Sequence, residues 1–148
     1  MAYTLQAIIG DAAMLRTGCP TGAKVVDLAQ GKAMIPLCGD LLEETEIPYL
    51  PLTDGGDEEL CEPINEFASR FKGRGQFAYV EAEFFGGTGT QACVTWDANG
   101  VASAPLVDQC AINTALKFLG IIIGDFHDEF DALGLGSHRN TEEWKPEE

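Results

Sequence analysis

The chain has 148 residues, 45% of them hydrophobic, with 9 lysines and arginines against 24 aspartates and glutamates, for a net charge of −15. A chain of this length can bury about two thirds of its unfolded surface around one core, so we expect a single domain over residues 1–148. The negative charge excludes nucleic acids and anionic membranes as partners, because binding either requires cations placed against phosphates. It favours a basic partner instead.

The sequence lacks the hydrophobic segments of membrane and secreted proteins and the cysteine spacing of a zinc or redox site. No segment has the roughly 18 apolar residues of a membrane-spanning helix, and the start, MAYTLQAIIGDAAMLR, lacks the basic and longer apolar regions of a secretory signal. We therefore expect a cytoplasmic protein. The five cysteines are widely spaced and include no C-x-x-C pair, which predicts mostly buried thiols and no zinc site or disulfide.

The first third of the chain predicts strands and one short helix. Residues 3–9, YTLQAII, are rich in β-forming side chains and end at a glycine, which indicates a first strand. Residues 11–18 suit two helical turns. Residues 24–31 and 32–37 are short apolar runs that indicate two strands, or a strand beside a short helix. Pro36 places the second run at a sheet edge or at the end of its pairing, because proline cannot donate to a ladder.

Residues 40–66 hold ten carboxylates and no lysine or arginine. Within this segment, residues 47–56 contain two prolines and two glycines and predict an exposed loop. A helix should follow over about residues 57–72, where apolar side chains recur every three to four positions. Pro63 places the start of its regular part near Glu62, because proline is tolerated only in the first turn.

The stretch FFGGTGTQ, residues 84–91, has three glycines in four residues, as phosphate-binding loops and tight turns both do. A phosphate-binding loop leads from a strand into a helix whose amide groups face the anion. Here QFAYVEAEFF precedes the glycines and TQACVTW follows them, and in each segment apolar residues recur at every second position. The pattern therefore predicts a β-hairpin that turns through Gly86–Gly89, with glycines supplying the backbone freedom of the turn.

The last third predicts a short strand over residues 101–106, a helix over 109–119 and another strand over 121–124. A short amphipathic piece follows, and residues from about 137 to 148 form a candidate mobile acidic tail. Together the elements predict an α+β fold: an antiparallel sheet of four to six strands, with two main helices, near 57–72 and 109–119, packed on one face. The run of consecutive strands after Gln76 favours a meander over a βαβ crossover.

Two groups of side chains could carry chemistry. His127 and His138, with Asp128 or Asp131, could form a metal site, although a solvated acidic helix face explains the same residues. Glu81 and Glu83 lie two apart on one strand and so point the same way, as an acid/base pair would, and as the outward face of a strand would too. No catalytic triad, H-E-x-x-H or Walker motif is present. We expect no enzyme, no metal and no cofactor.

In size and acidity, and in the segments AEFFGGTGTQACVTW and DEFDALGLGSHRNTEEW, the chain resembles small acidic bacterial immunity proteins that neutralise toxins. The resemblance covers about the last half of the chain and carries over no functional residue. It implies a non-enzymatic binding protein. A nuclease-type toxin would be a fitting partner, because a nuclease must present a cationic cleft to phosphates and carboxylates can mimic those phosphates.

The predicted partner-binding residues surround the proline-rich loop, where one tyrosine can be exposed among carboxylates. Aromatic side chains supply much of the contact energy at interfaces, and charge supplies the association rate. These residues are Glu43, Glu44, Glu46, Tyr49, Asp54, Asp57, Glu58 and Glu59. A solvated surface without a partner is the other interpretation of this segment. The alternative function is a small-molecule site or enzyme pocket between the sheet and residues 47–56, with Glu81, Glu83 and His127 as its polar groups.

Overall fold

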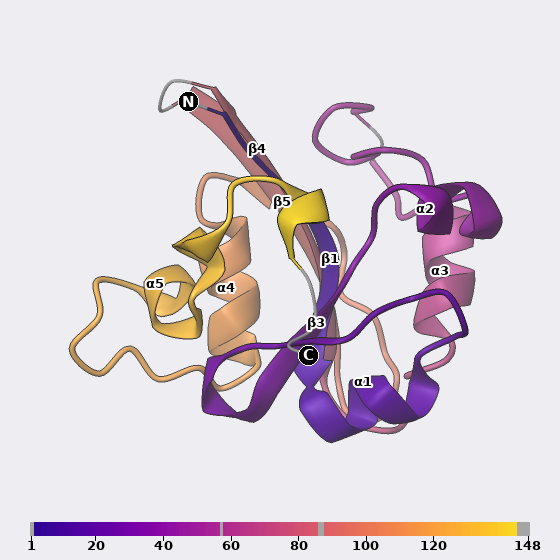
Figure 1. Ribbon diagram of the computed structural model, residues 1–148, viewed down its shortest axis with the longest axis horizontal. Coiled ribbons are helices and arrows are strands. Elements are labelled where there is room, and N and C mark those ends of the chain that lie inside the picture. Colours follow the sequence, from indigo (N-terminus) through magenta and orange to yellow (C-terminus); the bar gives the residue numbers. More distant parts are fainter. Residues whose placement is uncertain (1, 57, 86–87, 145–148) are drawn as a thin grey trace.

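The computed structural model describes residues 2–56, 58–85 and 88–144 (Figure 1). In this part of the chain six strands form one sheet in the order β2-β3-β1-β4-β5-β6, with every neighbouring pair antiparallel. The strands are β1 (Ala2–Asp11), β2 (Val26–Asp27), β3 (Lys32–Pro36), β4 (Phe77–Phe85), β5 (Thr88–Trp96) and β6 (Leu106–Asp108). The predicted α+β fold with an antiparallel sheet of four to six strands is confirmed.

The centre of the sheet is made of its three longest strands. β1 pairs with β4 from Ala2↔Phe85 to Gly10↔Phe77, and β4 pairs with β5 over its whole length, so the predicted hairpin is present. The tip residues Gly86 and Gly87 lie outside the described residues. At Gly89 an added Cβ would clash with the carbonyl oxygen of Glu83, so close strand packing, rather than a turn conformation, requires a glycine there.

Five α-helices connect or follow the described strands. They are α1 (Ala12–Gly18), α2 (Asp40–Thr45), α3 (Glu62–Ala68), α4 (Ala111–Phe118) and α5 (Glu129–Leu133). Helix α3 begins at Glu62 with Pro63 in its first turn, as expected, but it ends earlier than residue 72. Three-residue 3₁₀ turns lie at η1 (Ala29–Gly31), η2 (Leu135–Ser137) and η3 (Thr141–Glu143). No described helix is long and apolar enough to cross a bilayer.

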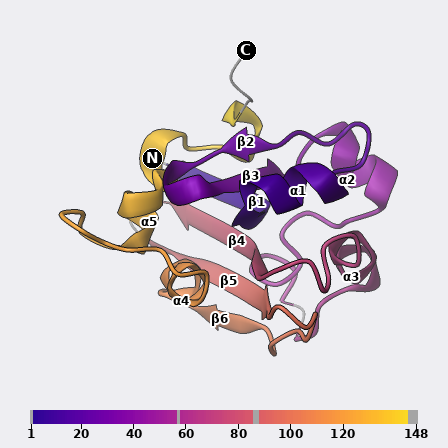
Figure 2. The ribbon, with the colours of Figure 1, turned by 90° about the horizontal axis from the view of Figure 1, so that it is seen from below.

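The helices cover both faces of the sheet, whereas the sequence predicted both main helices on one face. α4 and α5 pack on one side, and α1, α2 and α3 on the other (Figures 1 and 2). The reason lies in the strands, since their alternate residues are apolar on both sides. Val80 and Cys93 face α4, while Phe77, Tyr79 and Val94 face the other layer, all with exposed fractions of 3% or less. A sheet with two apolar faces needs cover on both.

The predicted strand over residues 121–124 is wrong. This segment is a loop whose backbone pairs with a side chain, because Gln30 donates to the carbonyl oxygen of Ile122 at 2.8 Å and accepts from its amide at 2.9 Å. A glutamine amide can donate and accept at once, so it replaces the partner strand at this residue. No disulfide joins the five cysteines, of which Cys93 is buried, Cys110 is exposed and the others are half-buried.

Residues 139–144 lie against β1 rather than forming a free tail. β3 pairs only with Ala7–Asp11 of β1, which leaves the earlier part of that strand edge to other partners. The C-terminal segment supplies them: the Thr4 amide donates to the Arg139 carbonyl oxygen at 2.7 Å, and the Gln6 amide donates to Thr141 Oγ1 at 3.2 Å. Backbone groups at a buried strand edge require such partners.

Candidate functional site

The carboxylates predicted to bind a partner lie on α2 and on the segment between α2 and α3. We call this surface, together with the exposed side of α3 beside it, the acidic face. Of the predicted set, all described members are exposed: Glu43, Glu44, Glu46, Tyr49, Asp54, Glu58 and Glu59. Asp57 lies outside the described residues. Tyr49 has an exposed fraction of 54%, which is high for an aromatic side chain.

No ion pair neutralises the acidic face within the described part of the chain. The three ion pairs found there join Arg16 to Asp27, Lys32 to Asp11 and Lys117 to Glu129, all outside residues 40–66. The exposed carboxylates of the face therefore keep their charge available to a partner. Their field is reinforced by the net charge of −15.

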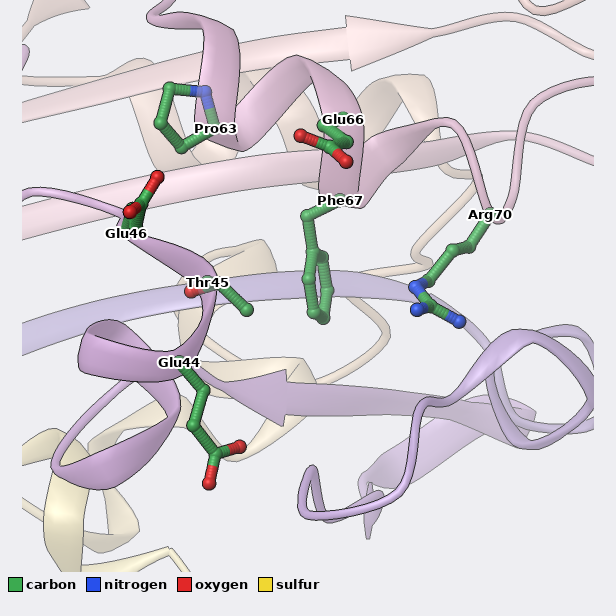
Figure 3. A pocket seen from close by; sticks show the side chains of 7 residues that line it. All are labelled: Glu44, Thr45, Glu46, Pro63, Glu66, Phe67 and Arg70. Atoms are coloured by element: carbon green, nitrogen blue, oxygen red, sulfur yellow. The ribbon is translucent and has the colours of Figure 1, made fainter.

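A cavity of about 290 Å³ hollows the acidic face between α2 and α3 (Figure 3). Phe67 and Pro63 supply its apolar surface, and Glu44, Glu46 and Glu66 bring carboxylates to it. Arg70 reaches toward Phe67 from the far end of α3. The face is thus a concave surface with an apolar centre and a largely acidic rim, which is the composition expected of a binding surface for a cationic group.

The segment between α2 and α3 is held down by polar side chains of the sheet. Gln6 donates through Nε2 to the Pro48 carbonyl oxygen at 3.0 Å and accepts through Oε1 from the Leu50 amide at 3.2 Å. Gln6 is 1% exposed, and its bond with the Leu50 amide is buried while that with Pro48 is partly buried. Ile47, Leu50 and Leu52 are buried beside it, so the loop that the sequence predicted to be exposed is anchored by its apolar residues.

Glu81 is the centre of this anchor and has no exposed surface. Its carboxylate accepts from the Leu52 amide at 3.2 Å, from the Thr53 amide and Thr53 Oγ1 at 3.0 Å each, and from the Tyr79 hydroxyl at 2.6 Å. Burial raises the pKa of Glu81, although these hydrogen bonds oppose the shift by favouring the charged form. Burial and the charge of Glu81 together raise the pKa of Tyr79.

The anchor fixes a backbone that is strained in two places. Glu46 and Leu50 have φ of 59° and 43°, the left-handed region that side chains other than glycine seldom adopt. Such conformations persist where surrounding contacts impose them. At Leu50 the contact is the bond from its amide to Gln6 Oε1, and at Glu46 it is the bond from its amide to the Glu43 and Leu42 carbonyl oxygens at the end of α2. The segment that carries Tyr49 and Asp54 is therefore held in a defined shape before any partner binds.

Sequence reasoning placed Glu81 and Tyr79 on a polar outward face and missed their role as an anchor. One signal was available in the sequence, since Phe77 and Tyr79 precede Glu81 at alternate positions and make that face apolar. An acidic residue that continues an apolar stripe indicates a buried carboxylate with dedicated donors. Trp96 is buried in the same layer and stacks on Phe77 with ring centroids 4.6 Å apart.

The structure does not bring together the three residues of the alternative pocket. Glu81 is buried under residues 50–53, and Glu83, on the same side of β4, is half-buried. His127 is exposed in the loop before α5, on the opposite side of the sheet. Its neighbour Asp128 caps α5 by accepting from the Asp131 amide at 2.9 Å. Across the described ranges, no three His, Cys, Asp or Glu side chains are grouped to hold a metal ion.

Comparison with known proteins gives no relative from which a role could be transferred. A scan of protein-family models, a search of curated proteins and a search of solved structures each returned no match.

Proposed function

We propose that the chain is a non-enzymatic binding protein whose acidic face occupies a basic surface of a partner protein. The partner class that fits best is a nuclease-type toxin, which would make the chain an immunity protein or inhibitor. The observation that carries the proposal is the set of exposed carboxylates, without an ion pair among the described residues, on a segment anchored by Glu81.

Anchoring matters because ordering a loop on binding costs affinity. A flexible acidic segment would lose conformational entropy when it docked, at about 0.5–1.5 kcal/mol for each immobilised side chain. The bonds from Gln6 and Glu81 fix the backbone of residues 48–53 in the unbound protein. The anchor therefore lowers the entropic cost that docking of a partner on this segment would otherwise carry.

Charge and shape suit a cationic cleft in particular. A nuclease must hold phosphates with cations, and a row of carboxylates offers the same charge to those cations. Tyr49 belongs to the same segment, has more than half of its surface exposed and can serve as an aromatic contact in an interface. Association driven by such fields is fast at low salt and slows steeply as salt rises.

The test is affinity capture from the native host with two charge-matched variants. The face variant carries Glu46→Gln, Asp54→Asn and Glu58→Gln; the control variant carries Asp108→Asn, Asp125→Asn and Asp131→Asn. All six positions are exposed, and each variant removes three negative charges. We expect the wild type and the control to capture the same basic protein at low salt and the face variant to capture much less.

The captured protein should then be purified and its association rate measured against salt. We expect at least a tenfold slower association for the face variant at low salt, with the difference shrinking at high salt. Inhibition of a nuclease activity of the captured protein would establish the toxin class. The proposal fails if no basic protein is captured at low salt, or if both variants lose it equally.

A further inference from the structure

The C-terminal segment, residues 139–144, binds β1 at a residue that also holds part of the acidic face. The Gln6 amide donates to Thr141 Oγ1 at 3.2 Å, and the Thr141 hydroxyl donates to the Thr4 carbonyl oxygen at 3.2 Å. Thr141 therefore bridges two backbone groups of β1, as a residue of a neighbouring strand would. Because Thr141 is only 6% exposed, these backbone groups depend on it rather than on water.

The side chain of the same Gln6 binds the segment between α2 and α3. Its Nε2 donates to the Pro48 carbonyl oxygen and to the Tyr79 hydroxyl at 3.0 Å each, and its Oε1 accepts from the Leu50 amide at 3.2 Å. Leu50 has a left-handed φ of 43°, a conformation that persists where a contact imposes it. Gln6 therefore joins the C-terminal segment, through its backbone, to the residues on either side of Tyr49, through its side chain.

The C-terminal segment also borders the acidic face. Asn140 and Glu142 line a hollow of about 300 Å³ together with Leu42 of α2 and Tyr49. Across the described ranges three hydrogen bonds join this segment to β1, whereas β1 and β4 pair over nine residues. A segment near a chain end that is held by few bonds can open while the sheet stays intact.

We propose that residues 139–144 act as a strap that controls the conformation of the segment carrying Tyr49. With the strap bound, Gln6 is fixed in its strand and its side chain holds the Leu50 backbone. When the strap leaves, the Gln6 amide loses its acceptor, this part of β1 becomes an open edge, and water competes for the Gln6 side chain. The backbone at Leu50 then relaxes. The consequence for a partner rests on the proposed function, since Tyr49 and its neighbouring carboxylates lose their preformed arrangement.

Amide hydrogen exchange, measured by nuclear magnetic resonance, tests this coupling without any partner. Thr141→Val keeps a branched side chain but removes both hydroxyl bonds, and a second variant lacks residues 139–148. The Ile112 amide, bound by Gln91 on the face covered by α4, reports overall stability. Relative to the Ile112 amide, we expect the Leu50 amide to exchange at least tenfold faster in both variants than in the wild type. Thr141→Ser, which keeps the hydroxyl, should stay within twofold of the wild type.

A double variant tests whether the coupling runs through Gln6. Gln6→Met keeps the backbone amide but lacks the side-chain bonds, so in its background Thr141→Val should change the relative Leu50 rate by less than twofold. The proposal is overturned if Thr141→Val leaves the ratio of the Leu50 and Ile112 rates unchanged, or if its full effect persists in the Gln6→Met background. Failure to capture a basic partner would refute the proposed function alone, because these exchange rates are measured on the isolated protein.

Discussion

The two faces of the sheet are covered by different kinds of structure, and their polar residues differ accordingly. On the face covered by α4 and α5, the buried polar side chain that the described strands contribute is Gln91, which accepts from the Ile112 amide in the first turn of α4 at 2.9 Å. On the other face an irregular segment, residues 46–56, covers part of the sheet, and Gln6, Tyr79 and Glu81 are buried beneath it.

The difference follows from backbone hydrogen bonding. A helix satisfies its own amide groups except in the first turn, so the sheet beneath it needs one polar residue at the helix start. An irregular segment cannot satisfy its amide groups internally, so the sheet must supply acceptors along its length. The buried polar residues of a sheet therefore mark where loops, rather than helices, cover it.

The largest expected effect is that of Glu81→Ala. It leaves the Leu52 amide, the Thr53 amide and the Tyr79 hydroxyl without their acceptor, at about 1–3 kcal/mol for each buried group. We expect the free energy of unfolding to fall by about 3 kcal/mol or more, measured by denaturant titration. Glu83→Ala, two residues along the same strand, should cost less than about 1 kcal/mol. Equal losses in the two variants would refute the anchor.

A smaller loss is expected from Gln91→Ala on the helix-covered face. This change removes one acceptor from the Ile112 amide at the start of α4, comparable to the loss of a helix cap at about 1 kcal/mol. Denaturant titration of Gln91→Ala and of Glu81→Ala gives the loss in the free energy of unfolding on each face of the sheet, so the two losses can be compared directly. A loss as large as that of Glu81→Ala would contradict the distinction between helix cover and loop cover.

The pH dependence of stability should change in Glu81→Gln. Burial raises the pKa of Glu81 above its ordinary value of 4.5, so the folded state holds this proton more tightly than the unfolded state. The contribution of Glu81 to the free energy of unfolding is therefore greatest at low pH and falls as pH rises through the folded pKa. Unfolding measured from pH 5 to 8 should show a wild-type advantage over Glu81→Gln that shrinks with rising pH. An advantage that grows with pH would contradict the direction of the shift.

The smallest effect on stability is expected from the acidic face itself. The Glu46→Gln, Asp54→Asn and Glu58→Gln variant should unfold within about 0.5 kcal/mol of the wild type, because exposed charges contribute little and these repel one another. The difference in the free energy of unfolding between this variant and the wild type can be measured by thermal and denaturant unfolding at two salt concentrations. A loss of several kcal/mol would mean that the exposed carboxylates hold the fold together, which would remove the contrast between the anchor and the surface.

Several local features could be predicted from the sequence because they depend on neighbours in the chain. The alternation in residues 77–85 and 88–96 and the glycines between them determine the hairpin. Pro63 determines that α3 starts at Glu62, and Pro36 determines that β3 ends its pairing there. The exposure of Glu43, Glu58 and Glu59 also follows from the sequence, since unpaired carboxylates remain in water.

The anchor and the second layer of helices were decided by tertiary structure. The alternation of residues in a strand does not show whether its second face is exposed to water or covered by another layer. From the sequence, Tyr79 and Glu81 are therefore predicted at the surface, whereas in the fold α3 and residues 46–56 cover them. The same holds for the C-terminal segment, in which Arg139 and Thr141 accept from an edge of β1 that β3 leaves unpaired. The charge of a segment and the residues that favour a turn depend only on neighbours in the chain, so both can be predicted from the sequence. The burial of a carboxylate depends on which distant segment covers it, and only the folded chain decides that.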